Sequence, residues 1–587
     1  MRGADSRVPY VKGCAMTSPT GPSTTAPPPD PRRWWALGAL VTALLVLGFD
    51  TTILNVALPT LAAQLGAGTG RQQWIADAYA VVFAGLMLPA GLLGDRFGRR
   101  RMLLCGLGIF LAGSLLGTLA DSAPLVIGAR AVMGTGAALI MPLAMSVLPS
   151  LFGPGERSTA VGAVSAASAL GLPLGPLVGG WLLDHFWWGS VFLVNVPLVL
   201  IGIAACVFLL PETSDPAAPP VDVRSALLTV TGLGALILGI IEGPARGWRD
   251  SLVLTSLAAS VVLIAALVLR GRGQARPMLD LRLLRSRGFL WNTVAAALGT
   301  LVLSGLMFLL PQYLQAVLGY DAFGTGLRML PMMGGLLLAA KGSGALAARF
   351  GPRPVVTGGL AVLACAAFLG ATTDVHDGYG ATARWLSLAG VGFGFAMVPA
   401  MDAALGALPA DRAGNGSGLL MTVRQIGGAL GVAVLGSLLA GAYGDRIDTA
   451  GLPPRAADAA GDSVVAAHLV AERLGVHRLA ASADRAYLHG MALALVVCGG
   501  AALVAGVLTA VFLPDPRGGS GNGGSSGPGR RSGTTGGRSG RGRRSRSRTP
   551  GARSGRGRQA DTADHPGTMG HPRTGTTMAT GTSHARE

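Results

Sequence analysis

Long apolar stretches, separated by short polar links, occupy most of this chain. Fourteen of them are long enough to cross a hydrocarbon core of about 30 Å, which takes about 20 residues of helix. They are expected at residues 35–58, 74–93, 102–120, 125–147, 159–182, 190–210, 225–243, 252–269, 289–310, 326–347, 355–372, 385–407, 417–440 and 490–513. Several contain proline, as at Pro142, Pro173 and Pro399, which neighbouring helices in a bundle accommodate. The pattern predicts an all-α polytopic membrane protein.

Composition agrees with a body that lies in lipid. Hydrophobic residues make up 50% of the chain and charged residues 13%, about half the share of charge in an average soluble domain. The mean hydropathy is +0.51, and 90 glycines suit close helix packing in a membrane. This balance excludes an ordinary soluble enzyme, a disulfide scaffold and a disordered chain. Because the sequence has no nucleophile–base set, phosphate-binding loop or metal-ligand cluster, we expect neither an enzyme nor a bound cofactor or metal.

The net charge of +18 is concentrated at one end of the chain. Residues 514–587 hold 14 arginines and 4 acidic residues, and they are rich in glycine, serine and threonine. Such a segment buries too little apolar surface to fold, and we expect a disordered tail. It has no aromatic residues between its arginines that could stack on bases, so specific nucleic-acid recognition is not expected. Residues 1–33, polar and rich in proline, are expected to be disordered as well.

Arginines mark alternate links between the expected spans. Residues 94–101 contain four arginines and residues 270–287 contain six, whereas alternate links such as 121–124 contain none. By the positive-inside rule the basic links, and with them both termini, are cytoplasmic. Residues 442–488 then form an extracellular loop, in which 463–489 are expected to form a short amphipathic helix, although Gly475 argues against it.

Three local patterns recur at a spacing of about 255 residues. An Arg-Phe-Gly sequence ends at Gly98 and again at Gly351, and Pro142 has its counterpart in Pro399. Acidic–arginine pairs follow at 156–157 and 411–412. The chain is therefore expected to contain two duplicated six-helix halves. Two such halves around a central cavity are a plan of secondary transporters, with a substrate site near the midplane.

This repeat divides the chain into five expected regions. The predicted boundaries are 1–33 for the N-terminal segment, 34–210 for the first half, 211–287 for two inserted helices and a basic link, 288–513 for the second half and 514–587 for the tail.

Asp50 is a carboxylate inside an apolar span and is a functional candidate for that reason. Asp50 is expected about 22 Å above the cytoplasmic start of its helix, and Arg130 about 9 Å below the outer end of its own helix. In a core of about 30 Å the two reach a similar depth. Burial disfavours the charged carboxylate and a nearby guanidinium favours it, so Asp50 is poised to load and release a proton. A hydrogen-bonded structural carboxylate is the alternative.

Four segments in order resemble one family. Residues 91–100 (GLLGDRFGRR) resemble motif A of the major facilitator superfamily, 130–136 (RAVMGTG) its motif B, and 171–180 (GLPLGPLVGG) its motif C. Residues 49–59 (FDTTILNVALP) are similar to the first-helix motif of the fourteen-span drug:proton antiporter branch. Residues 311–315 (PQYLQ) and 424–428 (RQIGG) are similar to second-half signatures of this branch. The resemblance covers about residues 35–513.

The resemblance implies a role for each motif. Motif A is expected to be a breakable latch that holds one face closed; its residues are Gly91, Asp95, Arg96, Gly98, Arg99 and Arg100. In the second half Ala348 stands at the position of Asp95, so one half alone carries the acidic latch. Motif C, the antiporter motif, implies a seal against proton leak, although it is also typical of an ordinary packing face; its residues are Gly171, Pro173, Gly175, Pro176, Gly179 and Gly180.

Two further charged residues are candidates for the substrate or gate region. They are Asp402, late in the twelfth span, and Arg424, early in the thirteenth. An interfacial carboxylate reached by water is an equal interpretation of Asp402.

The resemblance implies a bacterial antiporter of the cytoplasmic membrane. It would export amphipathic drugs or antibiotics in exchange for protons, with the proton gradient as energy source and membrane lipid around it. Two alternatives remain: a carrier dedicated to one metabolite, and a membrane anchor for a tail that binds nucleic acid or lipid. The sequence assigns neither the compound nor an oligomeric state.

Overall fold

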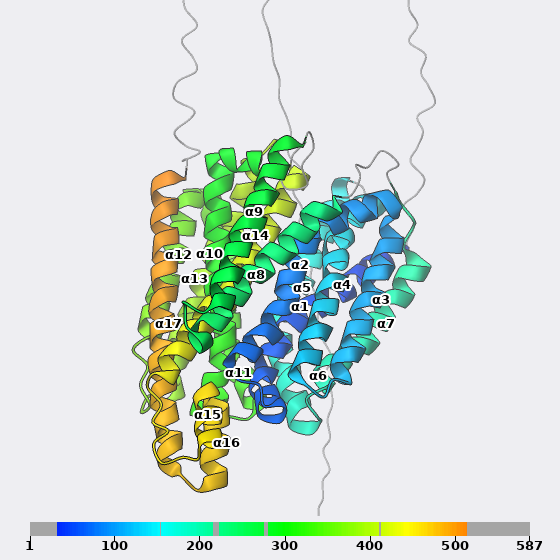
Figure 1. The fold of residues 1–587 in the computed structure, drawn as a ribbon. Coiled ribbons are helices and arrows are strands. Elements are labelled where there is room, and N and C mark those ends of the chain that lie inside the picture. Colours follow the sequence, from blue (N-terminus) through cyan, green and yellow to red (C-terminus); the bar gives the residue numbers. More distant parts are fainter. Residues whose placement is uncertain (1–31, 153, 215–221, 275–279, 410–412, 514–587) are drawn as a thin grey trace, which may run out of the picture. The chain divides into compact units, whose positions relative to one another are not determined.

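The computed structural model describes residues 32–513 except 153, 215–221, 275–279 and 410–412 (Figure 1). The chain divides into two units, Met1–Gly521 and Asn522–Glu587, and every helix below belongs to the first. The predictions for residues 1–31 and for the tail lie outside the described residues. Within the described part, all regular secondary structure is helical.

The first half is built from seven helical segments. They are α1 (Arg32–Leu65), α2 (Thr69–Phe97), α3 (Arg99–Thr118), α4 (Ala123–Leu151), α5 (Pro154–His185), α6 (Ser190–Leu193) and α7 (Asn195–Leu209). Helix α1 packs on α5, α2 and α3 pack on α4, and α7 packs on α1 and α3.

The second half repeats this scheme. Its segments are α10 (Arg287–Gln312), η2 (Tyr313–Val317), α11 (Ala322–Phe350), α12 (Pro352–Gly370), α13 (Tyr379–Gly406), α14 (Ala413–Gly444) and α17 (His477–Phe512). Helix α10 packs on α14, α11 and α12 pack on α13, and α17 packs on α10 and α12. The two halves therefore have the same order and the same neighbours, as the repeat predicts.

The turn that follows the second helix of each half is also repeated. Gly98 has a φ of +105° and Gly351 a φ of +92°, a region of backbone space that favours glycine. Each donates its N–H to the carbonyl four residues earlier, Gly94 and Ala347 respectively. A side chain at Gly98 would also collide with Glu212. The repeated glycine thus ends one helix and allows the next to begin at once.

Two further helices are inserted between the halves. They are α8 (Val223–Arg246) and α9 (Ser251–Gly273), followed by the short η1 (Leu281–Arg285). Helix α8 packs on α2 of the first half and α14 of the second, and α9 packs on α8. The hairpin is therefore in contact with both halves through α8.

Asp222 joins the two ends of this hairpin. Its carboxylate accepts hydrogen bonds from Ser225 N–H, which caps α8, and from Arg270 and Gln274 at the end of α9. Burial alone would raise the pKa of Asp222, but these hydrogen bonds hold it well below its usual range.

Thirteen helices in the described part are long and apolar enough to cross a membrane. They correspond to the predicted spans except 159–182. This segment lies within α5, a helix of 32 residues. Several side chains of α5 are not among those that the structure describes. The predicted total of fourteen is therefore not confirmed, whereas the all-helical membrane bundle is.

The single amphipathic helix predicted at 463–489 is wrong. The segment contains α16 (Val464–Leu474), preceded by α15 (Pro454–Asp462), and the last long helix has already begun at His477. Gly475, with a φ of +66°, ends α16 and donates its N–H to Ala471 and Glu472 carbonyls. This left-handed residue breaks the helix in two. Figure 1 shows α15 and α16 beside the end of α17 that starts at His477.

Candidate functional site

A buried ion pair joins α1 and α4. Arg130 Nη1 donates to Asp50 Oδ2 at 2.6 Å. The two residues are only 2% and 1% exposed, so the pair is shielded from solvent and competing ions. The structure thus brings together the two residues that were expected to lie at a similar depth in the membrane.

Two more helices complete the surroundings of this pair. Asn195 of α7 donates its side-chain N–H to Asp50 Oδ1 at 3.1 Å. On the other side Arg130 donates from Nε to the carbonyl of Ile75 at 3.4 Å. The guanidinium also lies over the ring of Tyr79, 4.4 Å from its centroid, which is a favourable cation–π distance. The carboxylate therefore has two donors, and the cation keeps two contacts on α2 that do not depend on Asp50.

Asn195 and Tyr79 are not among the site residues predicted from the sequence. Asn195 stands in a strongly apolar stretch and is fully buried, so the rule that singled out Asp50 would also have found it. Tyr79 is an ordinary membrane residue by sequence, and only the packing of α2 on α4 reveals its position. That packing depends on Gly134, because a Cβ there would lie 2.6 Å from the Tyr79 carbonyl oxygen.

The glycines of motif C press α5 against the part of α1 that carries Asp50. A Cβ at Gly171 would lie 2.8 Å from the backbone nitrogen of Phe49, and one at Gly179 would lie 2.5 Å from Ile53. A Cβ at Gly175 would collide with Thr52 Oγ1. The motif is thus a packing face, and the surface it covers includes the residues on both sides of Asp50.

The same helix makes a close junction with the second half. Gly180 packs on the backbone of Ala322, and Gly326 of α11 packs on the backbone of Pro176. The carboxylate of Asp184 accepts hydrogen bonds from the N–H groups of Ala322 and Phe323, at 3.2 and 3.0 Å. A negative charge is favourable there, because these N–H groups begin α11. Motif C therefore contributes both to the cover of Asp50 and to a contact between the halves.

Motif A ties helices together within the first half. Asp95 accepts from Arg99, one turn further on, at 2.8 Å. Arg99 also donates to the carbonyl of Ser146 on α4, at 3.1 Å. Gly94, which packs on Leu143, allows α2 to approach α4 closely enough for this contact.

The other motif A residues lie around this pair. The backbone N–H of Arg100 donates to Glu212 at 3.2 Å, and the Arg96 guanidinium lies 5.7 Å from the ring centroid of Phe97. A Cβ on Gly91 would lie 3.9 Å from Pro142, an ordinary contact.

The structure does not bring Asp402 and Arg424 together as an ion pair in the part that it describes. Asp402 is exposed on α13. Arg424 is half-buried on α14 and donates from Nη1 to the sulfur of Met401 at 3.4 Å. Among the described residues, no hydrogen bond or ion pair joins Asp402 or Arg424 to Asp50 or Arg130.

A second buried carboxylate, Asp77, was missed by sequence analysis. Asp77 is 1% exposed on α2, and both of its oxygens are without a hydrogen-bond partner among the described residues. It lies about 200° around the helix from Tyr79, on the side where Gln73 donates to the Val432 and Ala433 carbonyls of α14. It therefore faces the junction of the halves and not the Asp50 pair. The charged form is costly there because nothing compensates it.

No group of three or more metal-ligating side chains was found in the part of the chain that the structure describes.

Comparison with known proteins assigns the sequence to a family. The sequence model of the Major Facilitator Superfamily matches residues 40–432. A tetracenomycin C resistance and export protein of Streptomyces glaucescens is 33% identical over 502 residues, covering 83% of this chain and 93% of that protein. A multidrug efflux pump of Mycolicibacterium smegmatis is 33% identical over 496 residues, covering 84% and 98%. A methyl viologen resistance protein of Salmonella typhimurium is 32% identical over 425 residues, covering 71% and 84%.

Solved structures show the same fold at lower identity. A bacterial homologue of the human lysosomal transporter Spinster, solved in an inward-facing and unoccupied conformation, aligns with a TM-score of 0.59 and 18% identity. The alignment covers 82% of this chain and 97% of that one.

Proposed function

The chain belongs to the major facilitator superfamily, and we propose that this multi-pass membrane protein exports amphipathic drugs or antibiotics in exchange for protons. Relatives named for resistance to, or export of, tetracenomycin C and methyl viologen support this substrate class. The proposal includes a bacterial cytoplasmic membrane, with both termini on the cytoplasmic side as the arginine pattern predicts. Export needs no cofactor, because the proton gradient supplies the energy.

The observation that carries the proposal is the buried pair of Asp50 and Arg130. When a proton binds Asp50, the attraction between opposite charges is lost, and the neutral carboxyl keeps only weaker hydrogen bonds from the Arg130 guanidinium and the Asn195 amide. Arg130 retains its contacts to Ile75 and Tyr79 on α2. These contacts reduce the free-energy cost of leaving the guanidinium without the Asp50 carboxylate. Protonation therefore loosens α1 from α4 while α4 stays attached to α2. This is a local change that can bias movement of the first half.

Asp50 is a better coupling residue than Asp77. Asp77 has no cation in hydrogen-bonding contact among the described residues, so its protonation would break no ion pair. Protonation of Asp50 changes a contact between two helices, which is what coupling requires.

Motifs C and A lie at the two contacts that must open or close during transport. The α5–α11 junction at Gly180 and Asp184 lies on the predicted outer side and must separate when a compound is released there. Motif A, on the predicted cytoplasmic side, is the latch that re-forms as that side closes. In the conformation described here its Asp95 is held by Arg99.

A carrier dedicated to one metabolite is the second candidate. It shares the fold and the buried pair, and the substrate range distinguishes it. A membrane anchor for the basic tail is a third, and deletion of residues 517–587 tests it, because an exporter keeps near-normal transport without them.

The direct test uses the full chain reconstituted into acid-loaded vesicles with a pH-sensitive dye inside. Methyl viologen, puromycin and ethidium are added outside in turn, and proton release is recorded. Release triggered by several unrelated compounds is expected. Release by none of a broad panel, from vesicles proven to contain folded protein, would contradict drug export.

A further inference from the structure

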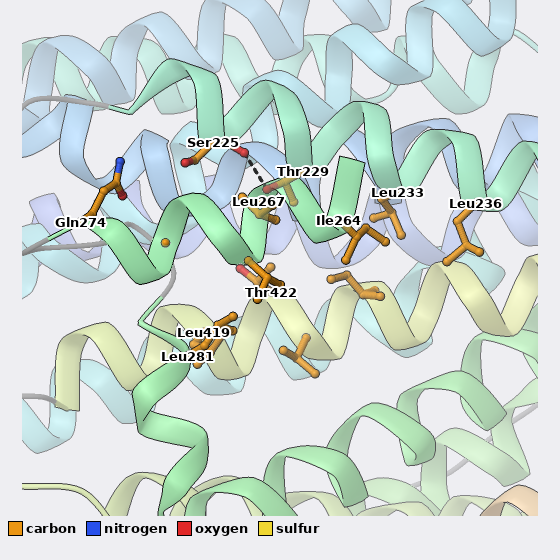
Figure 2. A pocket seen from close by; sticks show the side chains of 14 residues that line it. Ser225, Thr229, Leu233, Leu236, Ile264, Leu267, Gln274, Leu281, Leu419 and Thr422 are labelled. Carbon is orange, nitrogen blue, oxygen red and sulfur yellow. Dashed lines mark hydrogen bonds between the residues drawn. The ribbon is translucent and has the colours of Figure 1, made fainter. Parts of the chain in front are cut away.

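An apolar groove runs between the inserted hairpin and the second half. It has a volume of about 200 Å³ and is lined by side chains of α8, α9, η1 and α14. Helix α8 forms its floor, since α8 packs on both α9 and α14, and these two helices form the walls. Figure 2 shows Leu233, Leu236 and Ile264 of the hairpin on one side, facing Leu419 and Thr422 of α14. Neither Asp50 nor Arg130 lines the groove.

The dimensions of the groove match one half of a bilayer. From Ser225 to Leu236 the lining of α8 extends eleven residues, which is about 16 Å at the rise of an α-helix. One leaflet contributes about 15 Å of a 30 Å hydrocarbon core. The groove begins beside the start of α8 and the end of α9, which leads into the basic link, so it spans the depth of the predicted cytoplasmic leaflet.

The groove offers almost no polar group to an occupant. The hydroxyl of Thr229 donates to the Ser225 carbonyl, and the hydroxyl of Ser225 donates to Asp222. The Gln274 amide donates to Asp222 as well. The remaining lining is aliphatic, apart from glycine and the hydroxyl of Thr422. An alkyl chain suits this surface, because burial of its apolar area is the main gain available.

The end of the groove on the predicted cytoplasmic side, called its mouth below, has an exposed arginine on each of α8, α9 and η1. Exposed arginines stand directly beside lining residues: Arg224 precedes Ser225, Arg272 follows Gly271, and Arg282 follows Leu281. Arg270, by contrast, is neutralised by Asp222 at 3.1 Å. A cationic amphipathic compound would be repelled by these arginines, whereas a phosphate group would be attracted.

We propose that this groove binds one acyl chain of an anionic phospholipid from the cytoplasmic leaflet, with its phosphate among Arg224, Arg272 and Arg282. The lipid links the inserted hairpin to the second half through α9 and α14. Because α8 also packs on α2, the occupied groove stiffens the attachment of the hairpin while the halves move. The site is independent of proton coupling at Asp50 and goes beyond the proposed export function.

Native mass spectrometry of the purified full chain tests this site. Phosphatidylglycerol and phosphatidylcholine with identical acyl chains are titrated separately onto delipidated protein in detergent. We expect one phosphatidylglycerol to be held with a Kd at least tenfold lower than that of phosphatidylcholine. Equal affinity for the two lipids would overturn the proposal.

Two matched variants of α9 test the groove itself. Val268→Trp fills the groove, whereas Leu269→Trp places the same side chain on a surface that is 64% exposed, one residue away. We expect Val268→Trp to raise the Kd for phosphatidylglycerol at least tenfold and Leu269→Trp to change it less than twofold. Equal effects of both would show that the lipid does not occupy the groove. Leu267→Phe, a smaller change on the same wall, replaces Val268→Trp if that variant does not yield folded protein.

A second comparison of variants tests whether the arginines at the mouth of the groove bind the lipid phosphate. Arg272→Gln with Arg282→Gln should bring the Kd for phosphatidylglycerol to that of phosphatidylcholine, whereas Lys341→Gln, an exposed cation on α11, should leave the difference intact. If both changes act alike, general attraction to a basic surface explains the binding and the site is refuted. If methyl viologen displaces phosphatidylglycerol from the wild-type groove, the groove is a substrate site, and the lipid proposal fails.

Discussion

Replacing Asp50 by asparagine removes the charge of the carboxylate and preserves its shape. The introduced amide can still accept the hydrogen bond from Arg130 through its oxygen. Its new N–H group needs an acceptor, and Asn195 can supply one by turning its own amide, because Asn195 Oδ1 has no partner among the described residues. The hydrogen-bond geometry is therefore expected to survive the substitution.

Asp50→Asn removes the anion beside Arg130, but it keeps an oxygen that accepts a hydrogen bond from the charged guanidinium. A hydrogen bond with a charged partner contributes about 1.5–3 kcal/mol, so Asp50→Asn should lower the unfolding free energy by about that much less than Asp50→Ala does. Asp50→Ala leaves Arg130 buried at 2% exposure without an anion, and breaking a buried pair costs about 3–5 kcal/mol. Adding Arg130→Gln to Asp50→Ala should recover part of that loss, since the unpaired charge disappears.

Denaturant unfolding in detergent, followed by tryptophan fluorescence, measures these differences. The expected order of stability is wild type, Asp50→Asn, then Asp50→Ala, with the double variant above Asp50→Ala. The reasoning is refuted if Asp50→Asn destabilises as much as Asp50→Ala, or if neither has any effect. In the first case the charge is indispensable to the fold, and in the second the pair does not hold α1 to α4.

Three further predictions concern other parts of the bundle. Asp95→Asn breaks the 2.8 Å contact to Arg99 and should slow substrate cycling severalfold without changing which compounds are exported; a changed substrate profile in transport assays would contradict a latch. Gly175→Val should abolish transport or folding, because even a Cβ collides with Thr52, and normal activity in vesicles would refute the close packing of α5 on α1. The pKa of Asp222 is depressed in the folded protein, so its contribution to stability is complete above the usual pKa of about 3.9 and is lost as the pH falls below it. Melting temperatures between pH 7 and pH 3 should therefore fall less steeply for Asp222→Asn than for wild type, and parallel curves would contradict this linkage.

The pairing of Asp50 with Arg130 is predictable from the sequence because it depends on two properties that can be read along the chain. Depth in the membrane follows from position along a helix, and a charge in lipid requires a partner. The duplicated turn at Gly98 and Gly351 is predictable for the same reason, since a local conformation fixes the residue type.

The contacts that were not predicted depend on how helices distant in the sequence pack against one another. Tyr79 lies under the Arg130 guanidinium only because Gly134 allows α4 to approach α2, and no local pattern encodes that contact. The helix predicted at 463–489 contains Gly475, which argues against a continuous helix, and the left-handed conformation of that glycine does interrupt it.

Proton coupling at Asp50 is tested most directly by separating two transport modes in one preparation. Wild type and Asp50→Asn are reconstituted, and accumulation of methyl viologen driven by a pH gradient is compared with exchange of labelled for unlabelled compound at equal pH. Asp445→Asn, an exposed carboxylate at the end of α14, is the control. We predict that Asp50→Asn loses gradient-driven accumulation and keeps exchange. Gradient-driven accumulation in Asp50→Asn at the wild-type level, or its loss in Asp77→Asn instead, would contradict the central claim.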